Sequence, residues 1–321
     1  MEKQPKGIIT LGEALIDFIP LDVENINYQK SPGGAPANVA VGAARLGSKT
    51  TFVGKVGDDV LGEFLHDTLK KYGVQTEEMS FSKEVRTGVV FVTLQEDGER
   101  SFEFYINPGA DQFLRSDELN TQLFRENRIL HIGSISMIRE PVKGATDYAV
   151  TLAKENGMIV SFDPNIRLSL WTNEQEARET ILDMLPRADI VKVSEEEVAF
   201  LTGEEELEAG IEKLAAYRIP LLVVTCGKDG SRIVFGKDKA HVESLNVEAI
   251  DTTGAGDAFM SAFLYKLNEM EHHLSEFTLS DVVSIARFAS ISGGLAVSKK
   301  GAMTALPTMQ EVEEILRKGA N

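Results

Sequence analysis

Residues 190–225 have the sequence IVKVSEEEVAFLTGEEELEAGIEKLAAYRIPLLVVT, and this stretch decides the fold class. It starts and ends with short apolar runs, at 190–193 and 221–225, which are typical of buried strands. Between them, residues 196–217 carry apolar side chains at helical spacing. Two buried strands joined by a helix predict a parallel pair, with the helix packed on one face of the sheet.

The same alternation of strand and helix continues along most of the chain. Further strands are predicted at 8–11, 51–54, 129–132 and 159–162. Further helices are predicted at 36–46, 142–156 and 174–185. Asp58 or Asp59 can cap another helix, which ends before Gly73. We therefore expect an α/β fold whose mostly parallel sheet is covered by helices on both faces.

Three residues come just beyond the ends of the predicted parallel strands. They are Asp163, Ser194 and Gly227. Ligands of open α/β sheets bind beyond the carboxyl ends of the strands. We therefore expect the functional site at this edge of the sheet.

A different pattern interrupts the alternation between 89 and 106. The β-rich runs 89–94 and 101–106 are joined by Glu96-Asp97-Gly98-Glu99, and Asp-Gly is a strong signal for a hairpin. A hairpin inside a series of strands and helices is expected to leave the main sheet.

Composition excludes several classes of partner. Among 321 residues, 50 are acidic and 33 basic, and the resulting formal charge of −17 disfavours nucleic acid and anionic membranes as partners. No segment approaches the roughly 18 uninterrupted apolar residues that span a bilayer. The single cysteine, Cys226, follows an apolar run and is expected to be a buried thiol. We expect a cytoplasmic protein.

The strongest chemical signal is the string DTTGAGDAF at residues 251–259, at the start of a helical run. The small residues Gly254, Ala255 and Gly256 leave backbone N–H groups uncovered at a helix N-terminus, which is where a phosphate group binds. Asp257, in the first turn, is placed to accept a proton from a hydroxyl nucleophile. A short Gly-rich turn with an Asp can also be only a helix cap, but the longer string favours the anion site. The chain has no G-x-x-x-x-G-K-[ST], and no third glycine completes G-x-G-x-x-G here.

A second glycine cluster, Gly33-Gly34-Ala35-Pro36-Ala37-Asn38, precedes the first long helix. Two consecutive glycines let a ligand approach the main chain closely, and Asn38 offers both a donor and an acceptor to a hydroxyl group. A tight turn with Asn38 bonded to nearby backbone is the alternative. Asp17 interrupts an apolar extended run, which indicates a polar partner or a surface-facing position.

These two segments resemble the signatures of the PfkB (ribokinase-like) carbohydrate kinase family, and the chain is most similar to its bacterial fructokinases. The pattern at 33–38, continued by Gly47 and by residues 53–59, is similar to the N-terminal signature. Residues 251–259 resemble the C-terminal signature. The likeness extends from Gly12-Glu13 to Leu306-Pro307.

The resemblance implies one domain over 1–321, a three-layer α/β/α core with a small β-sheet lid made by about 13–32 and 86–108. It assigns sugar binding to Asp17, Gly33, Gly34, Asn38, Phe104, Asn107 and Asp257. Lid residues such as Phe91, Phe104 and Tyr105 would choose among sugars. Arg167 would neutralise charge on the transferred phosphoryl group. Ile106 stands where fructokinases usually carry a basic residue.

For the nucleotide and ions, the resemblance implies ATP, Mg²⁺ and K⁺. ATP would contact Lys192, Ser194, Glu197, Thr225, Gly227, Gly230, Gly254, Gly256 and Ser290. Ser194 and Ser290 replace asparagines of many relatives, and Glu197 would hold Mg²⁺ through water. The K⁺ ring would comprise Asp251, Thr253, Ala296, Lys299, Gly301 and Ala305.

The expected reaction is transfer of the ATP γ-phosphoryl group to a primary hydroxyl of a ketohexose, with D-fructose giving fructose 6-phosphate. Kinases for ribose, 2-keto-3-deoxygluconate or a nucleoside such as adenosine remain alternatives within the same chemistry. A non-catalytic sugar-binding sensor and a dinucleotide-dependent oxidoreductase are alternatives from other classes. Exposed edges of the lid strands predict a homodimer joined through the lids, as in many relatives.

Overall fold

The computed structural model describes residues 6–95 and 100–319. Its strands are β1 Ile8–Leu11, β2 Leu15–Pro20, β3 Tyr28–Gly33, β4 Thr50–Gly57, β5 Met79–Ser82, β6 Val89–Leu94, β7 Arg100–Phe104, β8 Ile129–Ile132, β9 Ile159–Phe162, β10 Ile190–Ser194, β11 Leu221–Thr225, β12 Ser231–Phe235 and β13 Asp238–Val242. Its α-helices are α1 Ala35–Arg45, α2 Val60–Lys71, α3 Leu123–Glu126, α4 Val142–Glu155, α5 Glu174–Met184, α6 Glu195–Thr202, α7 Leu207–Leu214, α8 Ala255–Glu269, α9 Leu279–Val297 and α10 Met309–Gly319.

The main sheet has nine strands in the order β13-β12-β11-β10-β9-β8-β1-β4-β5. All neighbours are parallel except β11–β12 and β12–β13, which are antiparallel. The expected mostly parallel sheet is therefore confirmed. In β1, Ile8 pairs with Thr50 on one side and Ile129 on the other, so the carboxyl ends of the parallel strands lie along one edge.

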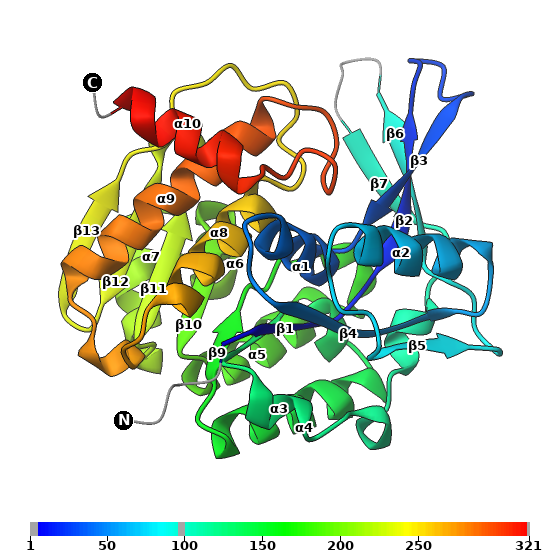
Figure 1. The fold of residues 1–321 in the computed structure, drawn as a ribbon, viewed down its shortest axis with the longest axis horizontal. Coiled ribbons are helices and arrows are strands. Elements are labelled where there is room, and N and C mark those ends of the chain that lie inside the picture. Colours follow the sequence, from blue (N-terminus) through cyan, green and yellow to red (C-terminus); the bar gives the residue numbers. More distant parts are fainter. Residues whose placement is uncertain (1–5, 96–99, 320–321) are drawn as a thin grey trace.

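Helices cover both faces of this sheet. Successive strand residues point to opposite faces, so each strand contributes side chains to both helical cores. Val191 and Leu222 belong to the core under α4–α7, whereas Ile190 and Leu221 belong to the core under α1, α8 and α9. Figure 1 shows these two helical layers on either side of the strands. The sheet thus fixes α1 and α8 next to each other on one face.

The second sheet has four strands in the order β3-β2-β6-β7, and it stands beside the core, next to α2 (Figure 1). Leu94 pairs with Arg100, so the predicted hairpin pairing is present, while its turn at 96–99 lies outside the described residues. Val90 pairs with Phe104, and Val92 with Phe102. Directly paired residues and alternate residues of a strand share a face, so these four side chains lie on the same face of this sheet.

Some predicted elements need correction. The single helix expected at 196–217 is divided into α6 and α7, because Gly203 adopts φ 73° and ends α6. Strands β5, β12 and β13 were not predicted from the sequence. The α2 cap is Asp59, whose carboxylate accepts hydrogen bonds from the N–H groups of Leu61 and Gly62.

Helix α9 is the most apolar helix among residues 6–95 and 100–319. By length and composition alone it could cross a membrane, with 19 residues and a mean hydropathy of 1.2. It packs against α8, β12 and β13, and its residues Val282, Ala286 and Ala289 belong to the core. It is therefore placed as a core helix.

Candidate active site

A cavity of about 420 Å³ lies beyond the carboxyl ends of β9, β10 and β11, between the start of α8 and the four-stranded sheet. Its size is typical of a small-molecule site. The predicted site residues that line it are Asp17, Gly34, Asn38, Phe104, Arg167, Lys192, Ser194, Thr225, Thr253, Gly254, Gly256 and Asp257. The sheet edge favoured by the sequence is therefore where these residues meet.

The phosphate end of the cavity is the N-terminus of α8. Gly254 adopts φ 77° as the N-cap, and a Cβ atom there would lie 3.0 Å from Cα of Ala302. The N–H of Ala255 donates to the carbonyl of Thr252. The next amides, of Gly256 and Asp257, belong to the first helical turn, where no carbonyl of the helix can accept from them. Together with the helix dipole they favour a bound anion.

A buried lysine stands in front of this turn. A Cβ atom on Gly256 would lie 3.0 Å from Nζ of Lys192, so the ammonium group faces the glycine directly. Nζ also lies 3.1 Å from the carboxylate of Asp163. Burial alone would lower the pKa of Lys192, but Asp163, Glu197 and Asp257 raise it above its ordinary value. Lys192 is therefore charged at neutral pH and forms a buried ion pair with Asp163 beside the helix start.

Asp257 lies between this phosphate end and the glycine loop of α1. Its side chain is buried, and Oδ2 accepts a hydrogen bond of 2.8 Å from Nδ2 of Asn38. Burial raises the pKa of Asp257 to about 6, against the lowering effect of the Asn38 bond. At pH 7 the carboxylate is mainly ionised and can accept a proton.

The sugar end is built on close approaches to the two consecutive glycines. A Cβ atom on Gly33 would lie 2.2 Å from Oδ2 of Asp17, and one on Gly34 would lie 2.4 Å from the carbonyl oxygen of Glu13. Neither position can carry a side chain without displacing the wall of the cavity. Burial raises the pKa of Asp17 to about 7, while Arg167 opposes this shift.

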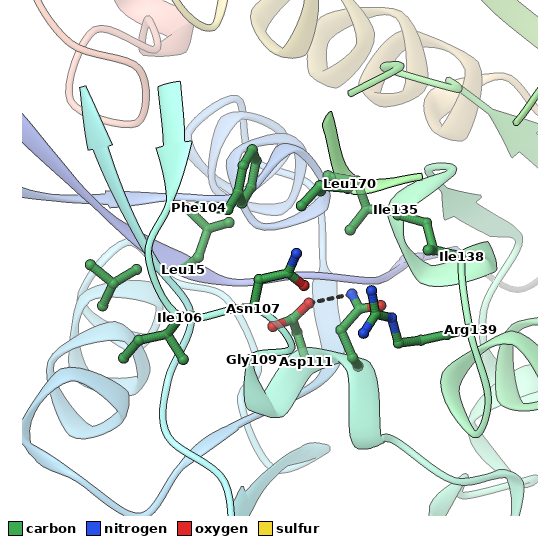
Figure 2. Close-up of a pocket in the computed structure, with 13 residues that line it drawn as sticks. Leu15, Phe104, Ile106, Asn107, Gly109, Asp111, Ile135, Ile138, Arg139 and Leu170 are labelled. Atoms are coloured by element: carbon green, nitrogen blue, oxygen red, sulfur yellow. Dashed lines mark hydrogen bonds between the residues drawn. The ribbon is translucent and has the colours of Figure 1, made fainter. Parts of the chain in front are cut away.

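A smaller cavity of about 20 Å³ adjoins the main one and shares Leu15, Phe104 and Ile135 with it. Asn107 lines this side cavity, and Figure 2 shows its side chain near that of Asp111. The volume is about that of one water molecule. Asn107 is therefore separated from the main cavity by Leu15 and Phe104.

The face of the four-stranded sheet opposite the cavity carries the other aromatic side chains. The ring of Phe91 stacks on Phe18 at 5.1 Å between centroids and contacts Tyr28 and Tyr105 edge-on. Of the three aromatic residues proposed to select the sugar, only Phe104 faces the cavity. Phe102, from the same strand, lines it too.

The other predicted site residues lie outside the lining of the cavity. Those that do not line it are Gly33, Asn107, Ala255, Glu197, Gly227, Gly230, Asp251, Ser290, Ala296, Lys299, Gly301 and Ala305. Gly230 has a backbone reason to be glycine, because a Cβ atom there would lie 2.0 Å from the carbonyl oxygen of Val242. Cys226 is buried, as expected.

Glu197 is held by backbone groups. Its two carboxylate oxygens accept hydrogen bonds from the N–H groups of Ser194, at 2.9 Å, and Ile166, at 2.8 Å. No group of three His, Cys, Asp or Glu side chains suited to a metal is found in the described part of the chain. The carboxylate is thus oriented beside the cavity but is already used in capping α6.

The predicted cation ring brings two distant segments together. Oδ1 of Asp251 accepts from the N–H of Thr253, and Oδ2 accepts from the N–H of Gly301, each at 3.1 Å. The N–H of Asp251 donates to the carbonyl of Val297. Asp251 therefore ties the loop before α8 to the segment after α9.

Comparison with known proteins places this geometry in a family. The sequence profile of the family described as pfkB family carbohydrate kinase matches residues 6–309. The chain belongs to the pfkB family of carbohydrate kinases.

Individual members of the pfkB family are similar over nearly the whole chain. Probable fructokinase-4 of Arabidopsis thaliana is 43% identical over 318 residues, which are 97% of this chain and 96% of that protein. The ATP-bound fructokinase of Xylella fastidiosa has a TM-score of 0.93 and 34% identity, and covers 99% of this chain and 100% of its own. A double-mutant fructokinase of Vibrio cholerae O395, bound to fructose, ADP and potassium ion, has a TM-score of 0.90 and 38% identity, with coverages of 98% and 100%.

Several residues that line the cavity of this pfkB kinase were not predicted as site residues, among them Glu13 and Phe102. Glu13 comes soon after β1, at the same edge of the sheet as Asp163 and Ser194. The rule that pointed to those two residues could also have found Glu13. Phe102 belongs to the predicted hairpin, but the face of a strand that meets a ligand is not set by the strand's own sequence.

Proposed function

We propose that this pfkB kinase is an ATP-dependent fructokinase, which transfers the γ-phosphoryl group of ATP to a primary hydroxyl of D-fructose and yields fructose 6-phosphate. The observation that carries the proposal is the position of Asp257, bonded to Asn38 of the sugar loop and set in the first turn of α8. A hydroxyl held by the sugar loop would meet a phosphoryl group held by the helix at this carboxylate. The similarity to fructokinases over nearly the whole chain supports fructose as the acceptor.

In the proposed reaction, the fructose hydroxyl oxygen attacks the γ-phosphorus, and the bond from that phosphorus to the β-bridging oxygen breaks. The hydroxyl proton passes to the carboxylate of Asp257, and ADP leaves with the bridging oxygen. Because the transferring group is loosely bonded, positioning and charge neutralisation supply most of the acceleration. Asp257 therefore needs only modest basicity, which a pKa of about 6 provides.

Charge neutralisation would come from groups at the phosphate end. Lys192 faces Gly256 at the start of α8, and Arg167 lines the same cavity. The helix amides would hold the phosphoryl oxygens. Ser194 and Thr225 line the cavity beside Lys192 and are placed for the nucleotide. Mg²⁺ would bind chiefly through ATP phosphates and water, with Glu197 as an outer partner.

The residues fit a monovalent cation near Asp251. The carboxylate and carbonyl oxygens of the two joined segments are hard donors of the kind that such an ion prefers, and the ion would order the loop that carries Gly254. We propose potassium as this ion. The potassium ion bound to the similar Vibrio cholerae enzyme supports the choice.

The same site chemistry would also serve other acceptors. Ribose, 2-keto-3-deoxygluconate and adenosine also offer a hydroxyl to such a base. The sugar end is small, since Leu15, Phe102 and Phe104 close it on the side of the four-stranded sheet. This wall favours a compact sugar over a nucleoside. The intact Asp257 argues against a catalytically silent sensor.

A coupled assay of ADP release over a sugar panel tests the proposal. We expect fructose to give the highest kcat/KM among fructose, ribose, 2-keto-3-deoxygluconate and adenosine. Omission of the acceptor should abolish ADP release, which controls for ATP hydrolysis. A higher kcat/KM for another acceptor would reject fructose, and inactivity with all of them would reject the kinase proposal.

We also propose that the four-stranded sheet is a lid and that two lids join in a homodimer. The hairpin β2–β3 exposes Leu21, Val23 and Ile26 at 65–75% of their surface, and the outer strands β3 and β7 have unpaired edges. Apolar tips and open edges of this kind are usually covered by a partner. Light scattering should give a dimer that Ile26→Glu dissociates, whereas a monomeric wild type would contradict the proposal.

The cytoplasm remains the proposed location.

A further inference from the structure

Glu13 is a buried acid of the cavity that the reaction outlined above does not use. Its side chain is 3% exposed and contributes to the lining beside Asp17 and Gly34. Oε1 accepts a hydrogen bond of 3.0 Å from the N–H of Ala35, the first residue of α1. Oε2 is buried and has no hydrogen-bond partner among the described residues. One oxygen thus holds the sugar loop, and the other is left unsatisfied.

An ionised carboxylate in this position is unfavourable for two reasons. It can only accept hydrogen bonds, so the buried Oε2 would lose its hydration without compensation. It would also add a negative charge close to Asp111, in the 3₁₀ helix at 110–113, and to Asp257 in α8. A proton on Oε2 removes the charge and turns an unsatisfied acceptor into a donor.

The charged surroundings of Glu13 support this description. Burial raises its pKa most, the backbone N–H groups of Glu13 and Ala35 oppose the shift, and Asp111 and Asp257 raise the pKa further, to about 8. Asp17 on β2, Arg167 and Lys192 line the same cavity. The first turn of α1 contributes no acidic side chain. The neutral form is therefore dominant at pH 7.

We propose that Glu13 is a further positioning residue of the sugar site and that it acts as an uncharged carboxylic acid. Through Oε1 it fixes the start of α1, from which Asn38 reaches Asp257. The hydrogen on Oε2, which is buried away from the cavity, keeps this support free of charge. The inference rests on the proposed function, because it concerns how firmly the same cavity holds fructose. Ionisation of Glu13 weakens fructose binding while ATP binding stays unchanged.

The experiment measures KM for fructose and for ATP, together with kcat, between pH 6.5 and 9.5. It compares the wild type with Glu13→Gln, which keeps a donor and cannot ionise. In the wild type we expect the fructose KM to rise by up to about tenfold per pH unit above pH 8, as a single titrating group requires. In Glu13→Gln the fructose KM should be close to the wild-type value at pH 7 and stay constant to pH 9.5. The control variant Glu84→Gln makes the same change at an exposed carboxylate outside the cavity and should keep the wild-type profile.

Each outcome bears on one proposal or the other. A fructose KM of the wild type that is constant from pH 7.5 to 9.5 overturns the inference, whether or not Glu13→Gln folds. An unchanged rise in Glu13→Gln, or a fructose KM raised more than tenfold in that variant at pH 7, also overturns it. An equal pH dependence of the ATP KM points to a general loss of structure and likewise rejects a role at the sugar end. Inactivity of the wild type with fructose at every pH would reject the proposed function itself.

Discussion

The two ends of the cavity have opposite electrostatic character, although Asn38 and Asp257 join them through a single hydrogen bond. The sugar end contains the carboxyl groups of Glu13, Asp17 and Asp257, and burial raises the pKa of each. The phosphate end contains Lys192, whose ammonium group forms an ion pair with Asp163, and the N-terminus of a helix. A neutral polyol suits the first end and a polyphosphate suits the second. The difference in charge between the two ends therefore directs each substrate to its own end of the cavity before the reaction begins.

The largest expected effect concerns the residue shared by both ends. Asp257→Asn removes the proton acceptor but keeps a side chain of the same shape beside Asn38. We expect kcat to fall by about 10³-fold, within the usual range for loss of a general base. Fructose binding, measured by titration calorimetry, should change by less than about threefold. A kcat within tenfold of the wild type would show that the two ends do not need a base between them.

The second effect tests the positive charge of Arg167. Arg167 lines the cavity and acts on both Asp17 and Asp257, lowering the pKa of each. Arg167→Gln should lower kcat by roughly 10–100-fold, because a charge that stabilises the transferring group is lost. Arg167→Lys should restore part of the rate, and Arg125→Gln on α3 serves as the surface control. Equal rates for Arg167→Gln and wild type would show that Arg167 does not stabilise the transferring phosphoryl group.

The third effect is the response of activity to acid. Since the pKa of Asp257 is about 6, its protonated fraction grows as pH falls through that value, and the base is lost. Below pH 6 we expect kcat/KM for fructose to decline about tenfold per pH unit, while it is retained between this value and about pH 8, where ionisation of Glu13 begins to raise the fructose KM. Asp17, with a pKa of about 7, can contribute to the same decline. If the decline of kcat/KM near pH 6 persists in the Asp17→Asn variant, it is due to Asp257. If the decline disappears in that variant, it is due to Asp17.

The smallest effect concerns the loop behind the phosphate end. Exchange of sodium for potassium chloride at constant ionic strength should raise turnover, because the ion orders the segment that Asp251 holds. The fructose KM should respond less than kcat, because this loop carries Gly254 at the phosphate end. Steady-state rates in the two salts decide the point. Identical turnover would remove potassium from the proposal.

Much of the core could be predicted from the sequence because its signals are local. The apolar runs at 129–132, 159–162 and 221–225 coincide with β8, β9 and β11. A buried parallel strand can be identified from a few consecutive apolar residues. The break at Gly203 was missed, because a single glycine within a helical pattern does not by itself end a helix.

The candidate site was predicted less completely, because its contacts are between distant segments. The glycine strings indicated where ligands approach, but not that Lys192 faces Gly256 or that Asn38 bonds to Asp257. Nor could the sequence show which face of β7 meets the cavity, since strands alternate and only the packing selects a side. Glu13 was not singled out, although the rule for sheet edges reaches it, because its own segment does not show that the carboxyl group is buried against the start of α1.

The bond between Asn38 and Asp257 spans 219 positions of the chain. During synthesis, the amide side chain leaves the ribosome long before the carboxylate it will hold has been translated. A nascent or truncated polypeptide that ends before α8 therefore has no complete reaction centre. The kinase can begin to consume ATP only after nearly the whole polypeptide has been made and folded.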